Sequence, residues 1–441
     1  MKMNKKNLFL IIIVLLVLPI IVDAKATPAK ISISVELEGD SIEKYDFLYE
    51  LQDLEGNIIQ TKRNNAGSVT FDNIEYQESD IGKTYYYIVK QKNESKEGLT
   101  YDDSTVYVGV EVGENETQVH YVKPSMYKKK EYHPFHATEE ELRGEAYAVY
   151  DIDTKTLTFF RDEPNKYTNQ EVIDNKVYFA DFETKDYFDY WIYNQYSYQN
   201  IEKIVFQDAV KPKSIRYWFQ EMPNLKEMDI RKLDTSLVTT FMEFLHNCSS
   251  LRNLDISTMD VSNVVDFTKA FKYSGIEELD FTIWNLEHLK GTRPLQEFVN
   301  SMPNLKYLNI SNFEGIDSSA EFANLPCLEY VHLGNKFKFN NSALDTTPPY
   351  FLKLEDYNLY SSIDLHIPYN VEEGTIGGHY VRPTCTNEAS FRNIYKKHEK
   401  EDTSIVIQNP PTKKNIIFIM ISIVIVALGI CYIKKNIDKK I

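Results

Sequence analysis

The chain has 441 residues, 43% of them apolar, which is enough for two or three domains with cores of their own and too apolar for a largely disordered protein. Between residues 26 and 412, 39 Lys and Arg face 63 Asp and Glu, a net charge of −24. Because so acidic a surface repels nucleic acid, we exclude nucleic acid as a partner.

The first 26 residues have the pattern of a secretory signal peptide. Lys2, Lys5 and Lys6 precede an apolar run from Leu8 to Val22, and Ala24-Lys25-Ala26 has the small-x-small form of a cleavage site. The run has only 15 residues and contains Pro19, which disfavours the alternative of an uncleaved membrane anchor. We therefore predict export of the segment that follows.

Residues 27–123 alternate apolar and polar positions in short runs such as ISISVEL, TYYYIVK and TVYVGVEV, separated by Gly, Asn and Asp. This period of two predicts an antiparallel β-sandwich. The phrases GSVTFDNIEYQESDIGKTYYYIVKQ and GLTYDDSTVYVGVEV resemble the pilin isopeptide-linkage (FctA-type) domain of cell-surface proteins.

That resemblance implies a Lys–Asn isopeptide bond, which needs a first-strand Lys, a last-strand Asn and a carboxylic acid to move protons. The expected first strand, Ile31 to Leu37, has no Lys, the expected last strand, Thr117 to Val122, has no Asn, and Gln91 stands where the acid belongs. We predict a fold without its crosslink; a bond from Lys30 or Lys123 is the alternative.

Residues 124–144 are charged and irregular, and we interpret them as a linker that ends in a short helix. His133 and His136 lie near two glutamates, but Pro134 interrupts a regular helical face, so a solvated linker is favoured over a zinc site. Residues 145–200 begin with a hairpin, AYAVYDIDTKTLTFFRD, and continue into an aromatic-rich stretch. We expect them to cap the repeats that follow.

A six-residue phrase, apolar-x-x-apolar-x-apolar, recurs six times within residues 201–335. First anchors lie 24, 26, 25, 29 and 23 residues apart, which predicts a solenoid whose turns each add one strand to a parallel ladder. The anchors are Ile201/Ile204/Phe206, Leu225/Met228/Ile230, Leu251/Leu254/Ile256, Ile276/Leu279/Phe281, Leu305/Leu308/Ile310 and Leu328/Val331/Leu333.

The wording of the turns adds a resemblance. PNLKEMDIRKLDTSLVTTFMEFLHNC is followed by SSLRNLDISTMDVSNVVDFTKAFKYS, and MPNLKYLNISNF and LPCLEYVHLGN repeat parts of both. These turns resemble the BspA-type leucine-rich repeats of bacterial surface proteins, most closely in the two middle turns. The resemblance implies a parallel β-ladder with an irregular or helical convex side.

One position of each turn points away from the predicted core and forms a strip along the ladder. We interpret this strip as a solvated acidic surface, with a face for a basic or glycan partner and a cation site as alternatives; a single ladder offers few oxygen ligands for a cation. Val205 takes this position in the first turn, and the strip continues with Asp229, Asp255, Asp280, Asn309 and His332; its flanks hold Arg231, Arg252, Lys306, Tyr307 and Tyr330.

Beyond the repeats we expect a C-terminal cap over residues 336–385, a polar stalk over 386–412, and a transmembrane helix with a basic tail over 413–441. Ile416 to Ile433 is an uncharged run of 18 residues, followed by lysines that favour the cytoplasm. The stalk ends in Asn409-Pro410-Pro411-Thr412, which resembles an NPxT-type sortase signal, although Lys413 is unusual after it. Sortase attachment and a permanent membrane anchor both remain open.

The four cysteines, Cys248, Cys327, Cys385 and Cys431, are too few for a disulfide scaffold, and buried free thiols are favoured over a structural bridge. No nucleophile elbow, phosphate loop, HExxH helix or zinc ribbon occurs, so we predict no catalytic residues, no metal and no cofactor.

Taken together, these features predict a non-enzymatic binding protein anchored on the outer face of a Gram-positive type of envelope. It would act as an adhesin, with the repeat face contacting a protein or glycan on a host or neighbouring cell. A structural spacer or pilus-like surface component is the alternative, and an extracellular enzyme with an unrecognised site is a third.

Overall fold

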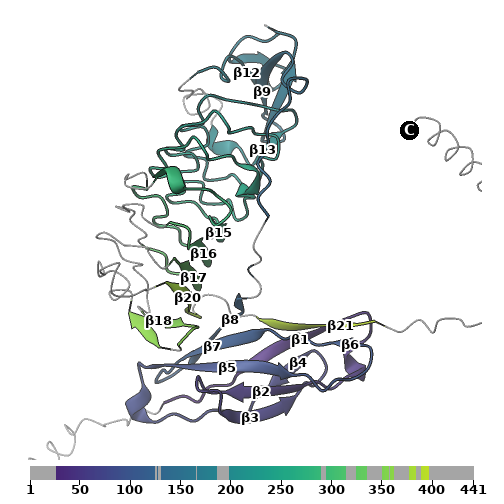
Figure 1. The fold of residues 1–441 in the computed structure, drawn as a ribbon, viewed down its shortest axis with the longest axis vertical. Coiled ribbons are helices and arrows are strands. Elements are labelled where there is room, and N and C mark those ends of the chain that lie inside the picture. The colour runs from purple at the N-terminus through teal and green to yellow at the C-terminus, as the bar shows by residue number, and fades with distance from the viewer. Residues whose placement is uncertain are drawn as a thin grey trace, which may run out of the picture. The chain divides into compact units, whose positions relative to one another are not determined.

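The computed structural model describes residues 26–124, 127, 131–164, 166–185, 198–289, 295–313, 324–334, 350–356, 358–361, 377–383 and 389–396. These residues form four β-sheets (Figure 1) and, within the described ranges, no α-helix. The short 3-10 turns are η1 (Ile42–Lys44), η2 (Glu78–Asp80), η4 (Tyr198–Asn200), η5 (Ile256–Thr258) and η6 (Glu287–Leu289).

Two sheets enclose the N-terminal core. One has the order β3-β2-β5-β7-β8 and the other β4-β1-β21-β6. Their strands are β1 (Ser32–Glu38), β2 (Leu48–Gln52), β3 (Ile58–Arg63), β4 (Ser68–Thr70), β5 (Thr84–Lys92), β6 (Leu99–Thr100), β7 (Thr105–Glu111), β8 (Gln118–Val122) and β21 (Ser390–Tyr395). We call residues 26–124 together with β21 the N-terminal domain.

The alternating pattern of residues 27–123 thus forms the predicted two-layer arrangement, with one correction. Ser390–Tyr395 was expected in the stalk, but it forms β21, between β1 and β6. β21 runs parallel to β1, so the sandwich is not antiparallel throughout. Phe391 is fully buried and contributes to the same core as Tyr49 and Val108, so this strand is an integral part of the domain.

The chain between β8 and β21 contains the cap hairpins and the repeated turns. The cap strands β9 (Glu145–Asp151), β10 (Thr156–Asp162), β11 (Glu171–Ile173) and β12 (Lys176–Phe179) join β13 (Lys203–Phe206) and β14 (Glu227–Asp229) in one six-stranded sheet. β10, β13 and β14 are parallel neighbours, so the ladder begins on β10 of the first hairpin.

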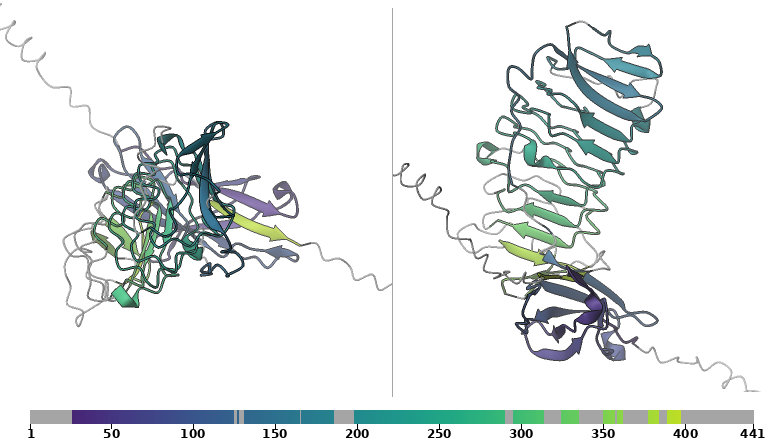
Figure 2. Two further views of the ribbon diagram at one scale, coloured as in Figure 1. Left: turned by 90° about the horizontal axis from the view of Figure 1, so that it is seen from above. Right: turned by 90° about the vertical axis from the view of Figure 1, so that its right-hand side faces the viewer.

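A second six-stranded sheet continues the turns. It holds β15 (Glu278–Asp280), β16 (Tyr307–Ile310), β17 (Tyr330–Leu333), β18 (Tyr350–Lys353), β19 (Leu359–Ser361) and β20 (Gly378–Val381). Leu279, Leu308 and Val331 are in register across three parallel strands, as their shared anchor position predicts. We call residues 201–334 the turn array; its short strands lie one above another in Figure 2.

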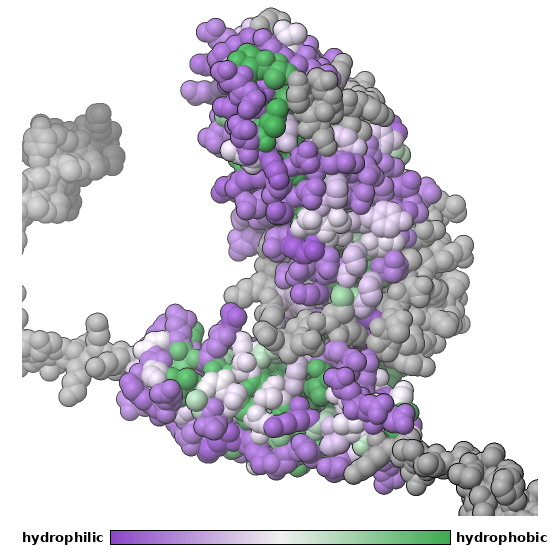
Figure 3. Space-filling model, turned by 180° about the vertical axis from the view of Figure 1, so that it is seen from behind, coloured by the Kyte–Doolittle hydropathy of each residue, from purple (hydrophilic) through white to green (hydrophobic). Residues whose placement is uncertain are grey.

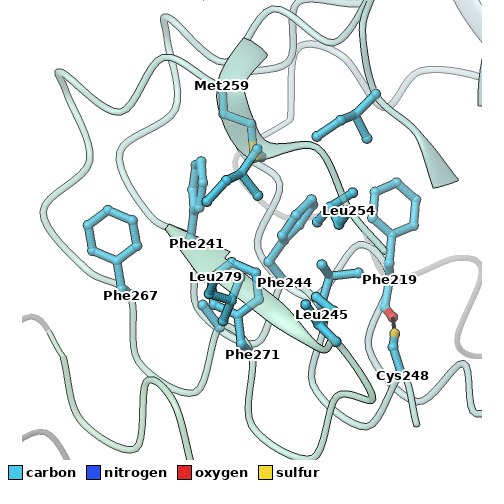
Figure 4. Close-up of a cluster of buried hydrophobic side chains, with 14 of the residues drawn as sticks. Phe219, Phe241, Phe244, Leu245, Cys248, Leu254, Met259, Phe267, Phe271 and Leu279 are labelled. Carbon is cyan, nitrogen blue, oxygen red and sulfur yellow. Dashed lines mark hydrogen bonds between the residues drawn. The ribbon is translucent and has the colours of Figure 1, made fainter. Parts of the chain in front are cut away.

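The ladder is not continuous, because the third turn forms no strand. Leu251, Leu254 and Ile256 are buried as predicted, yet the backbone around them bends into η5 and separates the two sheets. The packed interior does continue through this turn. Figure 4 shows Leu254 among buried side chains of neighbouring turns, including Phe244 and Leu279.

A second series of hydrogen bonds joins the turns far from the strands, and the sequence pattern did not predict it. Backbone N–H groups of residues 217, 219 and 221 donate to carbonyls of 242, 244 and 246, and the set repeats from 243, 245 and 247 and from 269, 271 and 273. The first and last donor of each set has positive φ, for example Tyr217 at 64° and Glu221 at 58°. These bonds stabilise backbone conformations that cost non-glycine residues free energy.

The far end of the array is closed by β20, which pairs antiparallel with β17. Arg382 follows β20, is fully buried, and donates to the carbonyl oxygens of Leu325, Pro326 and Leu328 at 3.0–3.2 Å. Burial lowers the pKa of its guanidinium to about 10. The Arg382 guanidinium thus supplies hydrogen-bond donors to backbone carbonyl groups at this end of the array.

Residues 131–144 are exposed or half-buried, in keeping with a solvated linker, but they form no helix at their end, and part of their backbone is hydrogen-bonded to the array. The N–H groups of His133 and Phe135 donate to the carbonyls of Ser257 and Thr258. Ala137 N–H donates to the buried carboxylate of Asp234 at 2.8 Å, and His136 lies 2.7 Å from Asp260. Residues 131–137 therefore follow the array, beside the turn that interrupts the ladder.

Candidate functional site

A group of buried and half-buried polar side chains lies beside β21. Lys123, just after β8, donates from Nζ to Asp102 Oδ2 and to the carbonyl of Ser390, both at 2.6 Å. Asp102 N–H donates to the side-chain oxygens of Gln91 and Asn393, each at 3.2 Å. We call Gln91, Asp102, Lys123 and Asn393 the strand latch, because these contacts join β21 to the other sheet.

Asp102 is the centre of the latch. Burial alone would raise the pKa of its carboxyl, but hydrogen bonds from Lys123, Ser104 and the N–H of Arg392 outweigh burial and lower this pKa below its usual value. The carboxylate is therefore charged at neutral pH. A charge in this place is tolerated because an ammonium group and several donors surround it.

Asn393 overturns the prediction that the last strand of the domain carries no Asn. The last strand of the domain is β21 rather than Thr117–Val122, and it does carry a buried Asn, 1% exposed. Sequence reasoning missed it because 267 residues separate Lys123 from Ser390. Its only local signal is the alternation in SFRNIY, where Phe391 and Asn393 share the inward face.

The first-strand position of the lysine and the position of the carboxylic acid remain unsuited to isopeptide chemistry. β1 lies against β21 and sets Val35 opposite Phe391 and Leu37 opposite Asn393, so no amine projects from this strand next to the amide. Gln91 is at the latch, as its expected role implied, but it is an amide and cannot shuttle protons. Among the described contacts, Lys123 reaches Asn393 only through Asp102.

The predicted binding strip divides into two parts. Asp229 forms an ion pair with Arg231 at 2.6 Å, Asp255 accepts from the N–H of Ser257, and Asp280 accepts from the N–H of Thr282. These carboxylates therefore serve local turns as well as facing solvent. Arg252 and Lys306 each pair with Glu277, so cations and anions alternate along this part of the array.

The remaining strip residues are not available as a free face. Tyr307 and Tyr330 are each 7% exposed and pack in a buried cluster with Ile88, Tyr107 and Val122 of the N-terminal domain. Asn309 is also 7% exposed, and His332 stacks on His379 with ring centroids 3.8 Å apart. The aromatic half of the predicted face is thus part of the packing against the N-terminal domain.

The described cysteines differ in their state. Cys248 is a buried free thiol that donates to the carbonyl of Phe219, and burial raises its pKa to about 12 (Figure 4). Cys327 is disulfide-bonded, which corrects the expectation of free thiols. Within the described ranges no three His, Cys, Asp or Glu side chains are grouped to hold a metal ion.

The view in Figure 3 is mainly hydrophilic, with small hydrophobic areas. No helix in the described part of the chain is long and apolar enough to cross a membrane. The signal segment 1–26, the run Ile416–Ile433, Cys385, Cys431 and the motif Asn409–Thr412 lie outside the described residues, except for Ala26.

Comparison with known families is informative for the part of the chain that carries the latch. Residues 31–170 match the Spy0128-like isopeptide containing domain, FctA. This FctA-type domain is pilin-like and typical of cell-surface proteins, which supports a surface location. Residues 191–322 match a second family, a Mycoplasma protein of unknown function, DUF285. None of the curated proteins matches the chain.

The FctA match ends between the cap strands β10 and β11, although the strand that completes the FctA-type domain is β21, far beyond it. The array is therefore inserted between the penultimate and last strands of this domain. The insertion separates Asn393 from the rest of the latch in sequence, while β-pairing brings them together in space.

Proposed function

We propose that this protein is a non-enzymatic, pilus-like structural component of the cell surface, in which the FctA-type domain is the frame and the turn array is a displayed insert. The observation that carries the proposal is the position of β21 between β1 and β6. Chain that leaves the frame after β8 returns to it at β21, so the array is attached at both of its ends. An insert held in this way can vary without interrupting the frame.

Recognition of a partner by the array is the second candidate function. We propose that the turns are leucine-rich repeats of the BspA type, which the spacing of the strands and the buried anchors support. The part of the strip with charges at the surface, namely exposed Arg231 and Asp255 and half-buried Asp229, favours a protein or glycan partner on a host or neighbouring cell. The buried tyrosines favour the structural role instead.

The mode of anchoring is a further part of the proposal. Sortase transfer through Thr412 and a permanent helix over Ile416–Ile433 predict different behaviour for Thr412→Ala. Under sortase transfer, the substitution makes the protein extractable by detergent while the parent stays with the wall. If the helix is the final anchor, parent and variant extract alike.

Two variants, each expressed in the cell that makes the protein, distinguish the structural role from the adhesive role. One variant replaces residues 125–388 by a short Gly/Ser linker, and a second carries Phe391→Asp, which places a charge in the core of the frame. We expect the first variant to enter surface assemblies like the parent while losing adherence, and the second to lose assembly. Assembly that needs the array but tolerates Phe391→Asp would contradict the structural role.

A further inference from the structure

The outward face of the cap sheet carries a row of aromatic side chains. Strands β9, β10 and β12 (Figure 1) are neighbours that bury alternate residues, such as Ala148 and Phe159, in the core. The residues between these point to the opposite face. There Tyr167, from the connection between β10 and β11, joins them. The aromatic row consists of Phe160, Tyr147, Tyr167 and Tyr178.

The rings of the aromatic row pack on one another, and each side chain is half-buried, so part of every ring meets solvent. Tyr167 stacks on Tyr178 with ring centroids 4.3 Å apart and lies 4.6 Å from Tyr147. Phe160 lies 5.6 Å from Tyr147. Beside the row, Ile173 of β11 is 41% exposed. A group of partly exposed rings next to an exposed aliphatic side chain is typical of a surface that another molecule covers.

A cation of the protein itself already lies over this row. The ammonium nitrogen of Lys166 is 5.5 Å from the ring centroid of Tyr167, and it also forms an ion pair with Asp162. The Lys166 side chain is 44% exposed, so it lies on the surface rather than in the packing of the cap. The contact shows that a ring of the row, together with a neighbouring carboxylate, attracts a cation.

Further acidic side chains surround the aromatic row. Lys176 of β12 lies on the same face and pairs with Asp151. Among the described residues, no ion pair involves Glu171 or Asp174. Burial is the main cause that raises the pKa of Tyr178, and the charges of these two carboxylates contribute to the shift. The row therefore lies in a negative electrostatic potential.

The aromatic row is continuous with the face of the predicted binding strip. Thr158 of β10 pairs with Val205 of β13, and Val205 pairs with Asp229 of β14. On the other side, Val149 of β9 pairs with both Thr158 and Tyr178. Residues paired in this way point to the same side of a sheet. The row and the charged part of the strip therefore form one surface.

We propose that this surface binds a basic protein segment, whose Arg or Lys side chains stack on the tyrosine rings and pair with the surrounding carboxylates. The acidic surroundings are complementary in charge to such a segment, and a planar guanidinium group suits stacking on aromatic rings. The proposal rests on the second candidate function, recognition of a partner, and places the main contact on the cap. A neutral glycan would use the rings without using the charge.

The proposal is tested with residues 27–412 and a fluorescent peptide of alternating Arg and Gly, whose binding is followed by fluorescence anisotropy. We expect the Arg peptide to bind more tightly than a Lys peptide, no binding of a Gln peptide, and weaker binding in added salt. Tyr167→Leu should weaken binding about three- to fivefold, the effect of one exposed cation–π contact. Tyr273→Leu is the matched control, because Tyr273 is 44% exposed and has Lys272 over its ring, but lies outside the row.

Lys166→Gln should have the opposite effect, because it removes the ammonium group that competes for Tyr167. We expect the Arg peptide to bind severalfold more tightly. Lys176→Gln is its control: it removes the same charge from the same face, but not from a ring, and its gain should be smaller. Lys166 and Lys176 are similarly exposed, so this comparison remains decisive if Tyr167→Leu does not fold.

Three results would overturn the proposal: equal effects of the two lysine substitutions, equal binding of the Arg and Gln peptides, or displacement of the Arg peptide by a neutral oligosaccharide of β-linked glucose. These measurements use purified protein, so their failure is distinct from a failure of the proposed function. If the purified protein binds no basic peptide, while cells still lose adherence when residues 125–388 are replaced, recognition by the array stands and the basic partner is wrong.

Discussion

The ammonium group of Lys123 lies 2.6 Å from a carboxylate oxygen of Asp102, and the two side chains are only 7% and 10% exposed. They come from different parts of the N-terminal domain and meet beside a strand supplied by the far end of the chain. An ion pair enclosed to this extent is costly to break, because the remaining charge loses its partner without regaining water.

Lys123→Met should therefore destabilise the N-terminal domain by about 3–5 kcal/mol, since Asp102 would be left charged and unpaired. Arg392→Gln is the control, because Arg392 and Glu36 form a pair that is 72% and 56% exposed and worth about 0–1 kcal/mol. Denaturant unfolding followed by tyrosine fluorescence measures both. Equal midpoints for the two variants would show that the latch adds no stability.

The intact mass of residues 26–396 should show no loss of ammonia. The amide of Asn393 is present, but β1 offers only Val35 and Leu37 beside β21, and Gln91 cannot accept a proton. Lys123 is engaged by Asp102 and by the carbonyl of Ser390. Mass spectrometry of denatured protein decides the matter, and a deficit of one ammonia would mean that Lys123 or Lys30 reaches Asn393 after all.

Leu254→Ala should cost about 2–5 kcal/mol, because a buried leucine at the centre of the array leaves a cavity when truncated. Leu254 is 6% exposed within the continuous core, whereas its neighbour Asn253 is exposed and supplies the control substitution Asn253→Ala. Thermal unfolding of residues 26–396 compares the two. A larger effect of Asn253→Ala would show that the assigned register is wrong.

The burial and pairing of the repeated anchors were predictable, because each turn contains the whole apolar pattern within six residues. Ile204 pairs with Met228 and Leu308 with Val331, as equal anchor positions require. The break at Leu254 was not predictable in this way. The anchors there have the same pattern, but the backbone bends into η5 beside the linker, a contact between segments more than 100 residues apart.

Asn393 and Tyr330 show a second limit of local pattern. SFRNIY is a short alternating run in polar surroundings, and only its pairing with β1 reveals a strand. Tyr330 was assigned correctly to the outward side of the ladder, yet the outward side here packs on the N-terminal domain. Local sequence determines which face a residue takes, whereas a contact between distant segments decides whether that face meets water.

Stability should fall on mild acidification because of His332. Burial, and then the neighbouring His379, lower the pKa of His332 to about 4, although Glu355 and Asp280 oppose the shift. Between about pH 6.5 and pH 4 the unfolded chain therefore binds more protons than the folded chain, so stability is complete above this range and is lost as pH falls through it. His332→Gln should flatten this part of the profile.

The measurement compares the free energy of unfolding at several pH values for the parent, for His332→Gln and for His133→Gln. His133 has a 72% exposed side chain, so its substitution should leave the profile unchanged. Other groups that face the stacked pair, namely Glu355, Asp280, Asn309 and Tyr330, remain in both variants. A parent profile that is flat between pH 7 and pH 5 would count against His332 as the sensitive group.

The N-terminal domain should fold without the array, but not without β21. Residues 26–124 alone lack Phe391 and leave β1 with an open edge, so we expect no cooperative transition. Joining residue 124 to residues 389–396 by a Gly/Ser linker of about eight residues, which spans roughly 15 Å, should restore the domain. Phe391→Ala in this short chain should cost about 3–5 kcal/mol of unfolding free energy, because the ring is fully buried.

Thermal unfolding and amide hydrogen exchange of β1 compare the three chains. Cooperative melting of residues 26–124 alone, at the temperature of the linked chain, would show that the frame does not depend on the strand that follows the array.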